Sequence, residues 1–140
     1  MLALRLVIDT NIVVSAALNE DGLQRTALLI ATTGPARLFV SEPIIEEYSR
    51  VLARPYLRIS KGLRQRLLQL IWNRSKVVVP RRRIEAALDP DDNMFLECAD
   101  SARADYLVTG NLKHFPKFWK NTKVIGARDF VSLAAPHFQR

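Results

Sequence analysis

The sequence has a single cysteine, Cys98, and no long apolar run at its beginning. One thiol cannot form an internal disulfide, and Cys98 shares an apolar pattern with Phe95 and Ala102, which is typical of a small buried residue. We therefore expect a reducing, cytoplasmic environment. The apolar run Leu4–Ile8 is too short for a signal sequence or a membrane span, so we expect no membrane targeting.

Acidic residues are missing from positions 50–83. This segment holds eleven basic residues, Arg50, Arg54, Arg58, Lys61, Arg64, Arg66, Arg74, Lys76, Arg81, Arg82 and Arg83, while the rest of the chain holds the other 10 basic and all 14 acidic residues. Such segregation suits a polyanion that lies along one side of the molecule. The alternative is a solvated helix face on which arginine serves solubility.

Internal repeats, low-complexity tracts and linkers are also missing. A chain of 140 residues with 49% hydrophobic residues can bury a core without disulfides or a structural metal. We therefore expect one domain over residues 1–140. The basic stretch, at about residues 50–83, is expected to form a helical arm between strands.

Short apolar runs alternate with helical patterns along the chain. Helices are expected directly after Asp9 and at residues 23–32, 42–52, 60–74, 89–103 and 127–134, and strands at 4–8, 37–40, 76–79, 106–108 and 123–125. This alternation predicts an α/β protein with a mostly parallel sheet covered on both faces.

Polar side chains stand where binding residues gather in such a sheet. Asp9 ends the first strand, Asp92 lies in the first turn of a helix, and Asn111 follows the fourth strand. Carboxylates that gather in one place repel one another, and a divalent cation is the usual compensation. Oxygen ligands alone select hard ions such as Mg²⁺ or Mn²⁺.

The helix at residues 42–52 carries two neighbouring acids. Its apolar stripe is expected to contain Ile44, Tyr48, Val51 and Leu52, and Glu47 lies on the flank of that stripe. Glu46 lies four residues before Arg50 and is expected to form an exposed ion pair with it. A carboxylate beside a buried face is costly without a partner, so Glu47 is the better candidate ligand.

Each polar residue also has a simpler explanation. Asp9 could cap the following helix, and Asp89, Asp91 and Asp92 could be capping and dipole residues, a role that we favour for Asp89. Glu47 could pair with an arginine of the basic stretch, and Asn111 could be a turn residue. All of these explanations would have to coincide to leave such residues at one sheet edge by chance.

Four motifs in this order resemble the PIN domain (PilT N-terminus) family, namely Leu6–Ile12, Glu46–Tyr48, Asp92–Ala99 and Thr109–Asn111. Two further runs, Glu47–Pro55 and Asp89–Asn93, are most similar to the subgroup of toxins of bacterial toxin–antitoxin pairs. The resemblance spans nearly the whole chain. It implies a three-layer α/β/α sandwich with a mostly parallel sheet of about four or five strands, divalent metal, and single-stranded RNA as substrate.

Carried over to this sequence, the resemblance puts the metal-binding acids on Asp9, Glu47 and Asp92. Many PIN domains have a fourth acid where this chain has Asn111, whose amide oxygen can ligate but adds no charge, so a second metal would bind more weakly. Asp91 is a weaker candidate ligand that could compensate for the missing fourth acid.

The resemblance implies an Mg²⁺- or Mn²⁺-dependent endoribonuclease, with Asn111 orienting metal or water. Thr10, Asn11, Ser41 and Thr109 are expected to support the ligands by hydrogen bonds. The RNA backbone is expected to contact basic residues, namely Arg54, Arg58, Lys61, Arg64, Arg81, Arg82, Lys113 and Lys117.

The two tryptophans and two histidines have weaker assignments. Trp72 and Trp119 could stack on bases, but Trp72 shares a helix with Leu67 and Ile71, which favours packing. His114 and His137 have no evident partner.

Two other functions are compatible with the sequence. One is a non-catalytic RNA-binding module that retains the fold, and the other is a phosphoacceptor signalling domain, although neither Ser41 nor Pro80 supplies an acceptor acid after its strand. The resemblance further implies an antitoxin partner and association into dimers, for which the apolar run Phe130–Leu133 could serve.

Overall fold

The computed structural model describes residues 3–135 of the chain. Six strands form one sheet, β1 (Arg5–Ile8), β2 (Arg37–Val40), β3 (Ser75–Val77), β4 (Tyr106–Val108), β5 (Phe118–Trp119) and β6 (Thr122–Ile125), in the order β3-β2-β1-β4-β6-β5. All neighbouring pairs are parallel except β5 and β6. The expected mostly parallel sheet is confirmed, with one more strand than expected.

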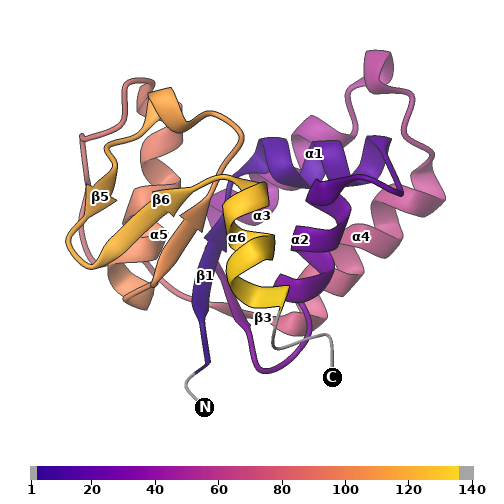
Figure 1. Cartoon of the computed structure of the whole chain (residues 1–140). Helices are drawn as coiled ribbons and strands as arrows, with labels where there is room; N and C mark the ends of the chain where they lie inside the picture. The colour runs from indigo at the N-terminus through magenta and orange to yellow at the C-terminus, as the bar shows by residue number, and fades with distance from the viewer. Residues whose placement is uncertain (1–2, 136–140) are drawn as a thin grey trace.

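Helices cover both faces of the sheet (Figure 1). Along the chain these are α1 (Thr10–Leu18), α2 (Leu23–Ala31), α3 (Glu42–Leu52), α4 (Lys61–Arg74), α5 (Asn93–Ala102) and α6 (Ala127–Ala134), with short 3₁₀ turns η1 (Pro55–Leu57), η2 (Pro90–Asp92) and η3 (Leu112–His114). In Figure 1, α2 and α6 lie in front of the sheet and α5 lies behind it. The three-layer α/β/α architecture is therefore confirmed.

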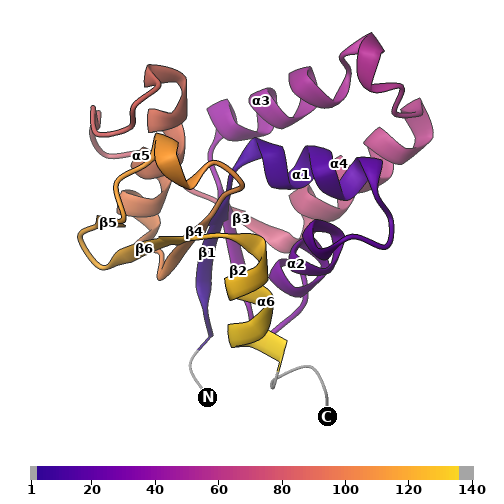
Figure 2. The same cartoon turned by 45° about the horizontal axis from the view of Figure 1, so that its top comes forward.

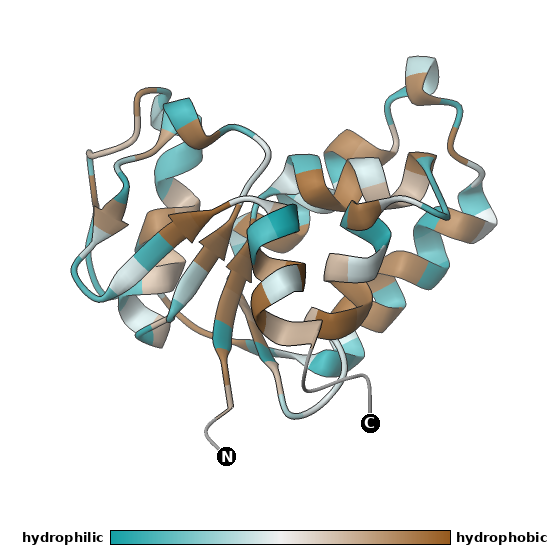
Figure 3. Ribbon diagram, in the orientation of Figure 1, coloured by the Kyte–Doolittle hydropathy of each residue, from teal (hydrophilic) through white to brown (hydrophobic). Residues whose placement is uncertain are grey.

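The core forms where the strands meet the apolar stripes of the helices. Ile44, Tyr48, Val51 and Leu52 are the buried residues of α3, as the sequence predicts. Figure 3 shows the central strands as almost continuously hydrophobic, which is typical of parallel strands covered on both faces. Cys98 is fully buried in α5, and burial raises the pKa of its thiol to about 12.

The segment between β2 and β3 contains α3, η1 and α4. Figure 2 shows α3 and α4 side by side, joined by the loop that carries η1. α4, in the middle of the basic stretch, also contacts β2 and β3 and so packs against the sheet. Ser60 caps α4, since its hydroxyl accepts a hydrogen bond from the Leu63 amide at 3.1 Å.

Trp72 corrects a sequence prediction. Leu67 and Ile71 of α4 are buried, but Trp72 is 51% exposed and does not pack with them in the core.

Two other segments differ from the sequence predictions or lie partly outside the described residues. The third strand ends at Val77, earlier than expected, and Val79 is exposed. At the C-terminal end, Phe130 is buried in the core whereas Leu133 is exposed, and His137 lies outside the described residues.

No helix within residues 3–135 combines the length and the apolar character that crossing a membrane requires.

The hydroxyl of Tyr48 donates a hydrogen bond to the Ile8 carbonyl and is fully buried. We expect Tyr48→Phe to lower the free energy of unfolding by about 1–2 kcal/mol, because the buried carbonyl loses its donor while the volume is kept. Urea denaturation measures this. Tyr56→Phe at an exposed position is the control, with a change within about 0.5 kcal/mol. Equal effects of both substitutions would contradict the prediction.

Candidate metal-binding groove at the carboxyl edge of the sheet

A groove of about 330 Å³ lies at the carboxyl ends of the parallel strands. Its walls contain Asp9, Glu47, Asp92 and Asn111, which come from the end of β1, from α3, from the start of α5 and from the segment after β4. We call it the acidic groove. Four polar residues that are far apart in the sequence therefore line one depression, as the strand-end pattern predicts.

Asp9 is the most buried acid of the groove, with 4% of its surface exposed. Its Oδ2 accepts hydrogen bonds from the Thr109 hydroxyl at 2.6 Å and from the Asn11 amide at 3.1 Å. Both donors use the same oxygen, so Oδ1 accepts from no other side chain within the described residues. Asp9 precedes α1, yet its side chain makes no capping hydrogen bond. The capping explanation for Asp9 is therefore wrong.

Burial raises the pKa of Asp9 to about 6, from an ordinary value of 3.8. The Thr109 hydrogen bond opposes this shift, whereas the charges of Asp92 and Glu47 add to it. The groove thus holds a carboxylate whose charge is costly in the isolated protein, and a nearby cation would remove that cost.

Asp92 stands at the start of α5 and also makes no capping hydrogen bond with its side chain. Burial, with the charge of Asp89, raises its pKa, and His114 counteracts that shift. The Nδ1 atom of His114 lies 3.3 Å from Oδ2 of Asp92. This pair was not predictable from the sequence, because the two residues are 22 positions apart and meet only in the folded chain.

Asp89 and Asp91 have other surroundings. The Asp89 carboxylate accepts the Asp91 amide at 3.0 Å and caps η2, which is the role favoured from the sequence. Asp91 is exposed and is not part of the groove wall, unlike its neighbour Asp92. The structure thus gives Asp91 no advantage as a substitute for a fourth acid.

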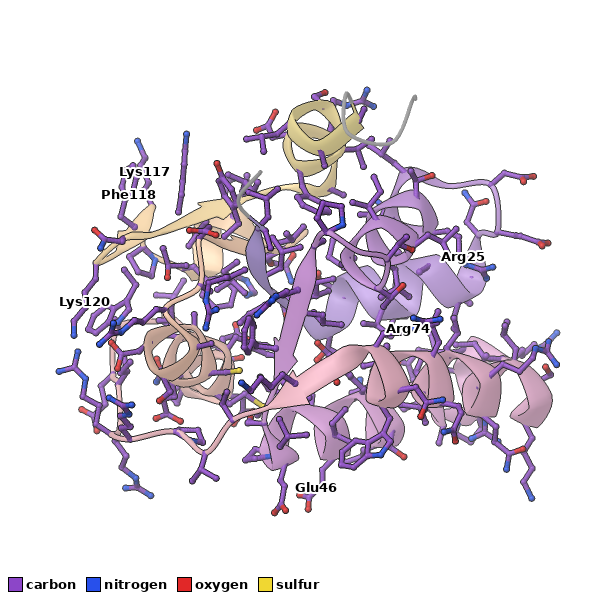
Figure 4. All side chains as sticks on the ribbon, turned by 90° about the horizontal axis from the view of Figure 1, so that it is seen from below. Arg25, Glu46, Arg74, Lys117, Phe118 and Lys120 are labelled. Carbon is purple, nitrogen blue, oxygen red and sulfur yellow. The ribbon has the colours of Figure 1, made fainter. Side chains whose placement is uncertain are left out.

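Glu47 lines the groove and also forms an ion pair with Arg50. The expected pair between Glu46 and Arg50 is wrong, because Arg50 turns toward the acid three residues before it instead of four. Glu46 is exposed, and Figure 4 shows it projecting from α3 away from the sheet. The helical phase separates the two acids as predicted, but the arginine partner differs.

The hydrogen bonds around the groove connect two strand ends. Asn11 donates to Asp9 and accepts the Gly110 amide at 2.9 Å, while the Thr109 hydroxyl accepts the Asn111 amide at 2.9 Å. The hydroxyls of Thr10 and Ser41 are buried and have no partner among the described residues. Ser41 follows β2 as Asp9 follows β1, so both unpartnered hydroxyls lie at the same sheet edge.

This donor set fits a hard divalent cation, because carboxylate, amide and hydroxyl oxygens are the ligands that Mg²⁺ and Mn²⁺ prefer. Within residues 3–135, no three acidic, imidazole or thiol groups converge into a formed metal cluster, and Glu47 is turned toward Arg50. The acids therefore share the wall of one groove without forming a closed ligand cluster.

Few of the basic residues lie at the groove. Arg54 lines it together with Tyr56, a residue that the sequence analysis missed although it stands between Arg54 and Arg58. Arg58 and Lys61 are exposed near η1, and Arg64 is half-buried in α4. Tyr56 is 72% exposed, so it stands beside the acids as an open aromatic ring.

Arg82 lies at the other end of α5, where it pairs with Asp100 at 3.1 Å and stacks over Trp119. The indole of Trp119 donates to Asp100, and these contacts, with the hydrogen bond from Arg82 as the largest, lower the pKa of Asp100 to about 2. Arg81 is at the same end, where its amide donates to the Ser101 hydroxyl. Arg81, Arg82 and Trp119 are therefore remote from the acidic groove.

A six-stranded, mostly parallel sheet between helices, with acids along its carboxyl edge, defines an α/β/α protein with an oxygen-lined site. The sequence profile of the PIN domain family matches residues 5–113. The chain belongs to the PIN domain family, so the resemblance noted in the sequence is confirmed. Membership in this family leaves the phosphoacceptor alternative without support.

Two known proteins are similar to this chain. "Uncharacterized protein MJ1680" of Methanocaldococcus jannaschii is 29% identical over 111 residues, which cover 77% of this chain and 71% of that protein. The crystal structure of VapBC2 from Rickettsia felis bound to a DNA fragment from their promoter matches with a TM-score of 0.57 at 16% identity, over 88% of this chain and 98% of the matched chain. The second likeness shows a shared fold.

The raised pKa of Asp9 predicts a pH-dependent effect of Asp9→Asn. In chelator, the parent loses stability as the pH rises from about 4 through about 6, because the carboxyl must ionise while buried. The asparagine does not ionise. Between pH 4 and pH 7, the free energy of unfolding of the variant should therefore rise by up to about 3 kcal/mol relative to that of the parent.

Urea denaturation at several pH values measures this difference, with the exposed Asp21→Asn as the control. A variant whose stability relative to the parent stays constant, or falls, over that pH range would contradict the prediction.

Proposed function

We propose that this protein is an Mg²⁺- or Mn²⁺-dependent endoribonuclease and the toxin of a toxin–antitoxin pair. The observation that carries the proposal is the acidic groove, in which Asp9, Glu47 and Asp92 line one depression at the strand ends. Membership in the PIN domain family supports nuclease chemistry. The similarity in fold to a protein of the VapBC2 complex supports the toxin assignment and an inhibitory protein partner.

Asp9, Glu47 and Asp92 would hold the metal, and Asn111 would offer a neutral oxygen beside them. A divalent cation in this groove supplies positive charge against the phosphate and makes water more acidic. Asp9 is the anchor, because Thr109 and Asn11 fix the orientation of its carboxylate within the groove.

The remaining groups of the groove would support the metal ligands and the RNA. The His114 imidazole contacts Asp92 and would position that carboxylate as a ligand. Arg54 and Tyr56 line the same groove, where a guanidinium can hold a phosphate and an aromatic ring can stack on a base. Release of Glu47 from Arg50 would free both a ligand and a cation.

The alternative is a non-catalytic RNA-binding module that keeps the same fold. The two functions differ in what the acids do, because a binding module has no use for three carboxylates beside its anionic ligand. The raised pKa of Asp9 supports the same distinction, since the ionisation of a buried acid costs free energy at neutral pH and adds negative charge beside an anionic ligand.

We expect the purified chain to cleave single-stranded RNA in Mg²⁺ or Mn²⁺ and to be inactive in chelator. Asp9→Asn and Glu47→Gln should each lower cleavage by about 100-fold or more, because loss of a metal ligand costs at least as much as loss of its supporting hydrogen bond. Glu46→Gln is the matched control on the same helix and should retain the parental rate.

A gel assay with end-labelled RNA measures these rates. Absence of metal-dependent cleavage by the parent, or equal rates for Asp9→Asn and the parent, would leave the binding module as the better description.

Asn111 supplies a second prediction, on the affinity for metal. Asn111→Asp adds a fourth carboxylate to the groove wall, so the affinity for Mn²⁺ should rise on the order of tenfold with the added charge. Calorimetric titration with Mn²⁺ measures this without any RNA. Asn121→Asp, at an exposed position outside the groove, is the control. Unchanged affinity in Asn111→Asp would remove position 111 from the metal site.

A further inference from the structure

A second depression, of about 480 Å³, adjoins the segment that follows the acidic groove. Lys113, Lys117 and Lys123 line it, together with the apolar side chains of Leu112 and Phe118. We call it the lysine hollow. Within the described residues, no aspartate or glutamate lines it. Its wall is thus apolar in its centre and positively charged at its rim.

Phe118 is 58% exposed at the edge strand β5, so the face of its ring is open to a ligand. The strand register sets Phe118 opposite Lys123 of β6, and Lys123 beside Tyr106 of β4. An aromatic, a basic and a second aromatic residue therefore form one row across three strands.

Figure 4 shows which side of the sheet this row occupies. Lys117 and Phe118 lie on the side of β5 that faces α6. Lys120 points elsewhere and pairs with Asp100 of α5 at 3.2 Å. The lysines of the hollow are thus separate from the ion-pair network around Asp100, and no carboxylate within the described residues forms a salt bridge with them.

The chain itself joins the two depressions. Asn111 lines the acidic groove, and the next two residues, Leu112 and Lys113, line the lysine hollow. A nucleic acid strand that leaves the groove along η3 would pass directly into the hollow. An exposed ring with lysines around it matches single-stranded nucleic acid, because bases stack on the ring while phosphates pair with the ammonium groups.

We propose that the lysine hollow binds a nucleotide of single-stranded RNA beside the cleaved phosphodiester, with its base on Phe118 and its phosphates on Lys113, Lys117 and Lys123. This inference rests on the proposed function, which places the cleaved bond in the acidic groove. Duplex RNA fits poorly, because its base faces are already stacked within the helix.

The test measures binding of a fluorescein-labelled 12-nucleotide oligouridine by fluorescence anisotropy in chelator, where metal-dependent cleavage cannot occur. We expect Phe118→Leu to weaken binding by about fivefold or more, because leucine keeps the apolar volume but loses the stacking plane. Phe118→Tyr keeps the aromatic ring and should bind the RNA with the affinity of the parent. Trp72→Leu, another exposed aromatic on the distant helix α4, is the matched control and should bind as the parent does.

The lysines are tested by the salt dependence of the same binding. Lys117→Gln and Lys123→Gln should each lower the slope of log affinity against log salt by about 0.7, the contribution of one phosphate contact on a single strand. Lys120→Gln is the matched control and should leave the slope unchanged. Circular dichroism and the melting temperature report whether each variant is folded.

The inference is overturned if Phe118→Leu binds within twofold of the parent, or if Trp72→Leu loses as much affinity. Equal affinity for duplex RNA, or displacement of the RNA by an acidic peptide that binds more tightly, would also overturn it and would assign the hollow to another ligand. The cleavage assay stays independent, since loss of binding in Phe118→Leu supports the hollow even if the parent cleaves nothing.

Discussion

The burial of one carboxylate, Asp9, governs the organisation of the carboxyl edge of the sheet. Its surroundings raise its pKa to about 6, so its charge costs free energy at neutral pH. The Thr109 hydroxyl and the Asn11 side-chain amide both donate hydrogen bonds to Oδ2 of Asp9. These donors reduce the cost without removing it, and a cation bound at this edge would offset the cost that remains.

The same contacts fix the loop that follows β4. The Thr109 hydroxyl donates to Asp9 and accepts from the Asn111 amide, and Asn11 accepts from the Gly110 amide. Thr109 is thus held by Asp9 at the end of β1, Gly110 by Asn11 of α1, and Asn111 by Thr109, and η3 begins directly after these residues. The position of His114 beside Asp92, and that of Lys113 at the neighbouring hollow, depend on this loop.

Sequence predicted the helices and parallel strands well because apolar periodicity is a local property, and α3, α6, β2 and β4 have the expected bounds. Contacts between distant segments were not predictable. β5 has two residues and exists only through its pairing with β6, and His114 meets Asp92 across 22 positions. Arg50 forms its ion pair with Glu47 and not with Glu46, because the rotamer of its side chain selects the partner and helical spacing does not determine that rotamer.

The segregation of charge has a different consequence from the one expected. Of the basic residues at positions 50–83, Arg54 lines the acidic groove, whereas Arg82 neutralises Asp100 at the far end of α5. Most of the stretch is therefore placed to influence a polyanion through its field, which within a Debye length would steer approach more than fix a bound pose. Register and position of such a ligand would then depend on groups beside the groove, where the open ring of Tyr56 lines the wall and His114 of η3 contacts Asp92.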